Sequence, residues 1–285
     1  MLKQRVITAL VLLLILLPTL FYRGSAPFCA LTLLLVGAGA WEWARLNGLG
    51  PLAAWLSGLA GVLICASSWW FGLLEQSLPL LWLLGGAAWV LLGAWVLRRG
   101  VLAWAGLPRW LRLLAGLFAL WLAWLALAQA RVIGVNFLLS ILVLVWVADI
   151  FAYFAGRAFG GRFSSSKLAP SISPGKSWEG VWGGVAGVVV LAFGWRWADA
   201  AWAVTVPSLY TQLGQQGGWL LLLAAVLMAT MSVVGDLLES MVKRSAGVKD
   251  SSGLLPGHGG VLDRVDAMLP TLPLALLLYS VAKLA

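Results

Sequence analysis

Charge is scarce in this 285-residue sequence: only 10% of its residues are charged, against about 25% in an ordinary soluble domain. Hydrophobic residues make up 62% of the chain. A soluble protein of this length could not cover so much apolar material with polar surface. The composition therefore excludes a soluble globular protein and indicates that the chain lies in a lipid bilayer.

Cysteine and histidine are also rare. The two cysteines, Cys29 and Cys65, lie in apolar runs without a C-x-x-C pair, which excludes a disulfide framework or a cysteine zinc site. The one histidine, His258, has no convincing serine partner in the sequence, so acyl transfer is not indicated. The apolar N-terminal run has a basic tip like that of a signal peptide, but no cleavage site follows, so we expect it to be a retained first span.

Long apolar runs predict an all-α, polytopic integral membrane protein, because a helix crosses a bilayer with about 20 mostly apolar residues. The nine predicted spans are Val6–Tyr22, Ala26–Trp43, Leu52–Phe71, Leu78–Leu97, Leu111–Ala130, Val135–Ala155, Val181–Trp197, Gly218–Val234 and Ala267–Ala282.

Basic residues are distributed unevenly between the two sides of these spans. With the N-terminus in the cytosol, 15 of the 19 Lys and Arg residues fall on the cytosolic side, and Arg23, Arg131, Arg196 and Lys283 fall outside. Such a bias sets orientation. We therefore expect a multi-pass protein of the cell inner (plasma) membrane, with its N-terminus in the cytoplasm and its C-terminus outside. The net charge of +9 would then suit anionic lipids and phosphates rather than nucleic acid.

Acidic residues divide the chain in two. Residues 1–134 hold only Glu42 and Glu75 and are interpreted as a plain transmembrane bundle. Residues 135–285 hold the other eight acids, seven of which fall at or inside the cytosolic face; Asp199 is the exception. We therefore expect the second half to be the catalytic region, with a polar cavity open to the cytosol.

The first polar motif is "WVADIFAYFAGRAFG". Asp149 lies toward the cytosolic end of a span, where an ionisable residue suggests function. On a helix, Tyr153 and Gly156 share its face, with Arg157 beside them. The alternative is a structural Asp149–Arg157 ion pair, with glycines for tight helix packing.

The second motif is "SPGKSWEG", after a polar loop. Ser173 and Pro174 predict a turn, and Ser177 is typical of a helix N-cap. Lys176 would then lie beside free amides at a helix N-terminus, a candidate phosphate site. An ordinary capped loop with a lysine reaching the interface stays open as the alternative.

The third motif begins with Asp236, Glu239, Ser240 and Lys243, whose spacing predicts one polar stripe on a helix. The glycine-rich stretch "GLLPGHGG" follows, and its glycines allow the backbone to approach a ligand closely. The alternative is a solvated amphipathic loop, but that would not require the sole histidine and paired carboxylates at a membrane surface.

Carboxylates combined with lysines and arginines indicate a magnesium-dependent reaction at phosphates. Mg²⁺ commonly takes one or two carboxylates and completes its shell with substrate phosphates, while Lys and Arg hold the remaining phosphate charge. Phosphoryl or nucleotidyl transfer depends mainly on such positioning and charge neutralisation.

These residues carry a resemblance to a known family. The run Ser240-x-x-Lys243-Arg244, then Lys249-Asp250, then Pro256-x-His258-Gly259-Gly260-x-x-Asp263-Arg264-x-Asp266 resembles the signature of phosphatidate cytidylyltransferases, the CDP-diacylglycerol synthases. The first two motifs resemble other parts of that family. Many members read Lys-Asp-Ser-Gly where this chain has Lys249-Asp250-Ser251-Ser252-Gly253, which displaces the glycine by one position.

The resemblance implies the conversion of CTP and phosphatidic acid into CDP-diacylglycerol and pyrophosphate, with Mg²⁺ as cofactor, in a homodimer. The expected metal ligands are Asp236, Asp263 and Asp266. The expected catalytic residues are Asp149, Asp236, Lys249, His258, Asp263 and Arg264. The expected substrate-binding residues are Tyr153, Arg157, Lys176, Ser240, Lys243, Arg244, Gly259 and Gly260.

Two other functions remain open from the residues alone. An ion-coupled transporter would also bury acids, although its sites usually lie near the bilayer midplane. A lipid-linked sugar-phosphate transferase would also use aspartates and Mg²⁺. Dependence of turnover on CTP separates these alternatives.

Overall fold

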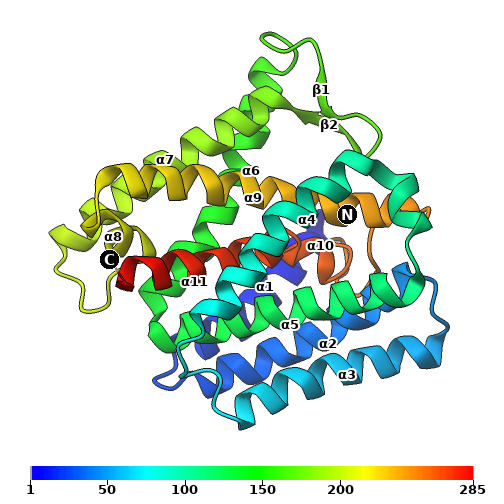
Figure 1. Ribbon diagram of the computed structural model, residues 1–285, viewed down its shortest axis with the longest axis horizontal. Helices are drawn as coiled ribbons and strands as arrows, with labels where there is room; N and C mark the ends of the chain where they lie inside the picture. Colours follow the sequence, from blue (N-terminus) through cyan, green and yellow to red (C-terminus); the bar gives the residue numbers. More distant parts are fainter. Residues whose placement is uncertain (1, 285) are drawn as a thin grey trace.

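The computed structural model describes residues 2–284, which form helices and one small hairpin (Figure 1). The elements are α1 (Leu2–Phe21), α2 (Ala26–Leu46), α3 (Pro51–Trp70), α4 (Pro79–Gly106), α5 (Arg109–Ile133), α6 (Val135–Phe159), β1 (Lys167–Ala169), β2 (Ser173–Ser177), α7 (Trp178–Ala201), α8 (Leu209–Gln215), α9 (Gly218–Ser245), α10 (Leu262–Val265) and α11 (Met268–Leu284).

Within residues 2–284, nine helices are long and apolar enough to cross a membrane, as predicted. Their outward surfaces are apolar too: Leu14, Leu52 and Leu91 are 76%, 74% and 69% exposed. Such exposure would be unfavourable in water and is favourable in hydrocarbon. The fold is therefore compatible with a polytopic membrane protein.

Three helices run past the predicted spans on the side of the polar motifs. Helix α9 continues beyond Val234 to Ser245, and α6 continues beyond Ala155 to Phe159. Helix α4 extends beyond Leu97 to Gly106, with a break at Gly100. Hydropathy detects only the part of a helix inside hydrocarbon, whereas its backbone hydrogen bonds continue beyond the membrane edge.

Small residues let α6 and α7 approach closely. A Cβ atom at Gly180 would lie 3.0 Å from the Ala152 carbonyl oxygen, and one at Gly184 would lie 2.9 Å from the Ala148 carbonyl oxygen. Such close contact between backbones favours helix association in lipid, where the hydrophobic effect contributes little. Helices α6 and α7 are consequently packed closely together, and α6 carries Asp149 toward its polar end.

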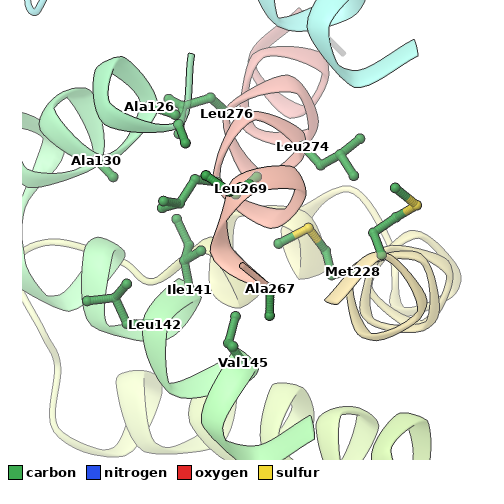
Figure 2. Packing of buried hydrophobic residues seen from close by; sticks show 14 of the residues in the cluster. Ala126, Ala130, Ile141, Leu142, Val145, Met228, Ala267, Leu269, Leu274 and Leu276 are labelled. Carbon is green, nitrogen blue, oxygen red and sulfur yellow. The ribbon is translucent and has the colours of Figure 1, made fainter. Parts of the chain in front are cut away.

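Helix α11 lies at the centre of the molecule and packs against α4, α5 and α9 (Figure 1). Figure 2 shows Leu269 and Leu276 of α11 among apolar side chains from α5 and α6, with Met228 of α9 on another side. Helices of both halves thus share one core. The division of the chain into residues 1–134 and 135–285 remains a prediction.

The sequence analysis missed the two-stranded hairpin and the short helix α8. It was also wrong about the turn at Ser173 and Pro174, because both residues belong to strand β2. The turn precedes them, where the Ile172 amide donates to the Ala169 carbonyl. Antiparallel pairing of β1 with β2 satisfies the backbone groups of this polar segment.

Figure 1 shows the start of α1 and the end of α11 on different sides of the molecule. The C-terminus lies near α8, which precedes α9, whereas the loop that joins α9 to α10 lies toward the end marked N. This loop, residues 246–261, is called the signature loop below, because it carries most of the third motif.

Candidate active site

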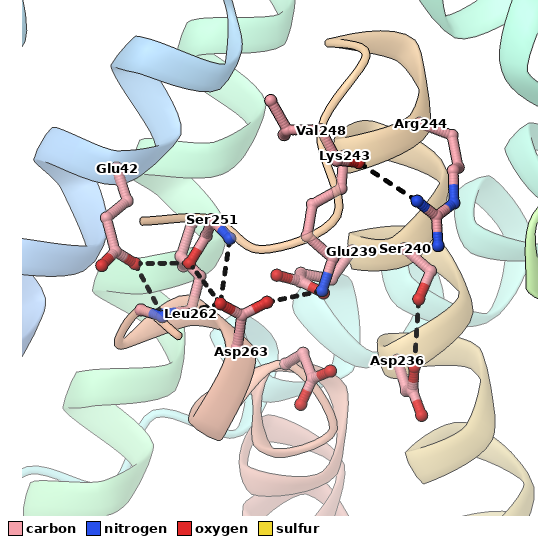
Figure 3. Close-up of polar contacts among 12 residues, drawn as sticks. Glu42, Asp236, Glu239, Ser240, Lys243, Arg244, Val248, Ser251, Leu262 and Asp263 are labelled. Atoms are coloured by element: carbon pink, nitrogen blue, oxygen red, sulfur yellow. Dashed lines mark hydrogen bonds and ion pairs between the residues drawn. The ribbon is translucent and has the colours of Figure 1, made fainter. Parts of the chain in front are cut away.

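The polar end of α9 presents the predicted stripe on one helical face. Lys243 forms ion pairs with Glu239 of its own helix and with Asp263 beyond the signature loop, where its Nζ lies 2.5 Å from Oδ1. The Ser240 hydroxyl donates to Asp236 at 3.3 Å (Figure 3). The stripe therefore forms one side of a charged cluster, as its i, i+3, i+4, i+7 spacing predicts.

Asp263 holds the two ends of the signature loop together. Its Oδ2 accepts hydrogen bonds from the Ser251 amide and hydroxyl, both at 2.9 Å, and from the Gly260 amide at 2.7 Å. Its Oδ1 accepts from Lys243. Both carboxylate oxygens are thus engaged by protein donors, which gives Asp263 a structural role in this arrangement.

Two predicted substrate-binding glycines shape this loop. Gly259 has a φ of +80°, which favours glycine, and a Cβ there would lie 2.6 Å from Asp263 Oδ2. A Cβ at Gly260 would overlap Ser251 and Glu42. The Gly260 amide, expected to approach phosphate, donates instead to Asp263 here, so its substrate contact remains a prediction.

Three carboxylates gather at the other side of the stripe. Asp149 of α6, Asp236 of α9 and Asp266, which follows α10, lie on elements that pack together, since α9 contacts both α6 and α10. A Cβ atom at Gly235, next to Asp236, would overlap the Asp266 carbonyl oxygen. Lys176 forms an ion pair with Asp236 Oδ2. The fold therefore brings all three sequence motifs to the polar end of α9, where they form one charged cluster.

Asp149 does not form the structural pair with Arg157 that was the alternative explanation of the first motif. In the described part of the chain, neither residue forms an ion pair, and the Arg157 guanidinium donates instead to the Tyr153 hydroxyl at 3.1 Å. Asp149 and Tyr153 are exposed. Gly156 contributes to packing, since a Cβ there would contact Ser177 and Gly180 of the neighbouring segment.

The second motif carries Lys176 to the cluster. Ser177 caps α7 by accepting a hydrogen bond from the Gly180 amide at 3.2 Å, which confirms the predicted N-cap. Glu179, 4% exposed, accepts from the amides of Phe163 and Ser164 and so fixes the preceding polar loop. Lys176 thus belongs to a strand that is fixed at both ends, and its side chain reaches Asp236 of α9.

The remaining predicted residues surround the cluster. Arg244 donates to the carbonyl of Ile172 at 3.4 Å and of Val248 at 3.2 Å, and so links α9 to the hairpin. Lys249 is exposed. His258 lies in a tight turn in which its amide donates to Leu255, and among the described residues its Nδ1 has no hydrogen-bond partner.

The sequence analysis missed the part that the N-terminal half plays in this site. Glu42 of α2 is completely buried and accepts hydrogen bonds from the signature loop and the start of α10. Arg5 and Thr8 of α1 donate to the carbonyls of Gly257 and Pro256. One signal was available: Glu42 is an acid inside an apolar run, where ionisable residues are costly.

The residues present have the right donor chemistry for Mg²⁺, although they do not form a complete protein cage. Across residues 2–284, no three Asp, Glu, His or Cys side chains form a group that could hold a metal ion. Mg²⁺ does not require such a cage, since it usually combines one or two carboxylates with water and substrate phosphates. Asp266 and Asp149 retain that capacity, whereas Asp236 would first have to exchange Lys176 or Ser240.

Comparison with known proteins points to the same family as the sequence motifs. The model of the cytidylyltransferase family matches residues 3–282. The chain is 43% identical over 277 residues to the phosphatidate cytidylyltransferase of Pseudomonas aeruginosa, covering 96% of this chain and 95% of that protein. It is 36% identical over 290 residues to that of Brucella abortus, covering 98% and 92%. It is 49% identical over 140 residues to that of Haemophilus influenzae, covering 49% and 44%.

Proposed function

The chain belongs to the cytidylyltransferase family, and we propose that it transfers the cytidylyl group of CTP to phosphatidic acid. The observation that carries the proposal is its similarity, over 96% of its length, to a relative named for this activity. The charged cluster supports it from the chemistry, since carboxylates and cations meet there on the ends of apolar helices.

The reaction requires little covalent chemistry from the protein's own side chains. A phosphate oxygen of phosphatidic acid attacks the α-phosphorus of CTP and forms a new P–O bond. The bond from the α-phosphorus to the α,β-bridging oxygen breaks, and pyrophosphate leaves with the electron pair. Because the nucleophile is already anionic, the task of the site is positioning and charge neutralisation.

The cations of the cluster would hold the phosphates. Lys176 and Lys243 arrive from different elements and are each held by carboxylates, which fixes their positions before substrate binds. Arg264 and Lys249 are exposed and free to reach a phosphate. Arg244 and Ser240 would assist from α9, and His258 would donate to a phosphate oxygen beside the glycine turn.

Mg²⁺ is the proposed cofactor, and it would neutralise the triphosphate charge. Asp236 and Asp266 would hold it, with Asp149 close by. Asp236 would first exchange Lys176 or Ser240. Asp263 was the other predicted ligand; it too can join only by exchanging one of its present donors, since both of its oxygens are engaged. Its geometry favours a bracing role in the loop.

The proposed orientation follows from charge. Lys and Arg are concentrated at the ends of the helices that carry the cluster, which supports a cytoplasmic active face, a cytoplasmic N-terminus and a C-terminus outside. The bacterial relatives suggest the inner membrane. A site at the membrane edge would take phosphatidic acid from lipid and CTP from the cytosol. A homodimer remains part of the proposal.

The alternatives lose support from the same observations. A transporter would place its acids near the midplane between broken helices, whereas here they gather at one end of the helices. A sugar-phosphate transferase finds no support among the reported relatives, which are named as phosphatidate cytidylyltransferases.

The deciding experiment uses labelled CTP and purified protein in detergent. Formation of a labelled lipid and release of pyrophosphate only when phosphatidic acid is added is the expected result. CTP hydrolysis without lipid labelling, or labelling without CTP dependence, would contradict the proposal.

A further inference from the structure

Glu42 is a completely buried acid whose hydrogen bonds all come from the signature loop and the start of α10. Its Oε1 accepts from the Ser252 hydroxyl at 2.6 Å and the Val261 amide at 2.9 Å. Its Oε2 accepts from the Ser251 hydroxyl at 3.0 Å and the Leu262 amide at 2.8 Å. The donors lie more than two hundred residues away along the chain.

Two of these donors are the amides of consecutive residues at the beginning of α10. Val261 has no side chain that could cap this helix, so Glu42 caps it from α2. A carboxylate is favoured at this position because the first amides of a helical turn have no acceptor within the helix. Figure 3 shows Glu42 directed at Ser251 and Leu262 across the loop.

The arrangement leaves little freedom to the loop. A buried carboxylate without donors is strongly unfavourable, so displacement of the loop would leave Glu42 uncompensated. Gly260 has no room for a side chain between Glu42 and Ser251. At this point the loop backbone therefore passes directly beside the acid, and the Val261 amide donates to it.

The contacts continue from Glu42 to the charged cluster. The Ser251 hydroxyl lies 3.0 Å from Glu42 and 2.9 Å from Asp263, and its single proton can serve one of them at a time. Asp263 in turn holds Lys243. Glu42 thus fixes, through the loop, the residues that fix a cation of the active site.

We infer that Glu42 is a positioning residue for the cytidylyl transfer, acting through the signature loop without contacting substrate. This inference rests on the proposed function and adds to it a contribution from the N-terminal half. Ser252, which stands where the family pattern has glycine, supplies one of the four hydrogen bonds. The serine that takes the place of the family's glycine therefore adds a contact to Glu42.

The principal test is Glu42→Gln. Glutamine offers one acceptor oxygen where Glu42 has two, so a loop amide would face an NH₂ group. Per folded molecule, kcat/KM for CTP is expected to fall about tenfold or more, because a small misplacement of binding groups has effects of this order. The KM for phosphatidic acid should stay near the wild-type value, and hydrogen exchange at Gly260–Leu262 should accelerate.

Asp199→Asn is the matched control. Asp199 is also buried, 5% exposed, and accepts from Asn136, Ser208 and Thr211, but at the opposite end of α9 from the signature loop. It should lower the melting temperature and leave kcat/KM for CTP unchanged per folded molecule. An equal loss of kcat/KM in this control would show that the Glu42→Gln effect reflects a general loss of stability, and it would overturn the inference.

Ser252→Ala keeps the test decisive if Glu42→Gln does not fold. It removes one of the four hydrogen bonds and should lower kcat/KM for CTP about threefold, with faster exchange in the same amides. Wild-type kinetics or wild-type exchange in the folded variant overturns the inference. If the wild-type protein does not use CTP, the proposed function fails, while exchange still tests whether Glu42 holds the loop.

Discussion

Lys243 and Asp263 meet across the signature loop, with 2.5 Å between Nζ and Oδ1. Both side chains are largely buried, at 12% and 5% exposure. The contact joins the end of α9 to the start of α10, so the two halves of the third motif reach the site as one unit. A change at either residue should therefore affect both the loop and the phosphate-binding charges.

Asp263→Asn should lower kcat at least about a hundredfold. Asparagine removes the charge opposite Lys243 and directs an NH₂ group toward existing donors, and losing such an electrostatic contact costs about 3–4 kcal/mol in a preorganised site. Steady-state assays of purified protein measure the effect. The control Asp250→Asn changes an exposed acid and should lose less; near-normal turnover in Asp263→Asn would remove this residue from the site.

Gly259→Ala should reduce activity and stability together. A Cβ would be forced against Asp263 Oδ2 at a φ of +80°, which costs about 1–3 kcal/mol in backbone strain alone. Gly253→Ala lies in the same loop with open space around it and should behave like the wild type. Thermal unfolding and kcat measured side by side would refute this account if the two variants were indistinguishable.

Asp149→Asn should lower turnover about tenfold or more while the protein stays folded, because Asp149 is exposed within the charged cluster and forms no ion pair in the described residues. The melting temperature and kcat are both measured. A lower melting temperature with unchanged kcat per folded molecule would instead assign Asp149 a purely structural role.

Removal of divalent cations should abolish turnover. Mg²⁺, held by Asp236 and Asp266, would offset the negative charge of the triphosphate. Without it, these two carboxylates would repel the triphosphate, and the lysines alone would not offset this repulsion. EDTA treatment followed by graded addition of Mg²⁺ provides the measurement. Full activity in EDTA would exclude the proposed cofactor.

Sealed membrane vesicles test the orientation. Because CTP does not cross a bilayer, inside-out vesicles should consume added CTP, and right-side-out vesicles should do so only after permeabilisation. The reverse pattern would show that the active face lies outside and that the distribution of Lys and Arg was misinterpreted.

Much of the architecture could be predicted from the sequence. Nine apolar runs predicted nine helices that could cross a membrane, and residues 2–284 contain nine such helices. The Ser177 cap and the polar stripe on α9 were also predicted correctly, because each depends on residues a few positions apart. Hydropathy and helical spacing are local properties, so the sequence determines them before the chain is folded.

Other features depended on distant contacts. Pairing with β1 placed Ser173 and Pro174 in a strand where local preference had predicted a turn. Glu42 looked like an isolated acid in a plain bundle, but its donors come from Ser251, Ser252 and the start of α10. No local pattern identifies such a partner.

The sequence by itself therefore determined which segments are apolar, where the polar chemistry is concentrated and which family the motifs resemble. Only the tertiary structure decided that Asp263 braces the loop and that the N-terminal half closes the site through Glu42. The physical reason is that a buried charged side chain requires hydrogen-bond partners. The packing of the helices determines which residues, however distant in the sequence, supply these partners.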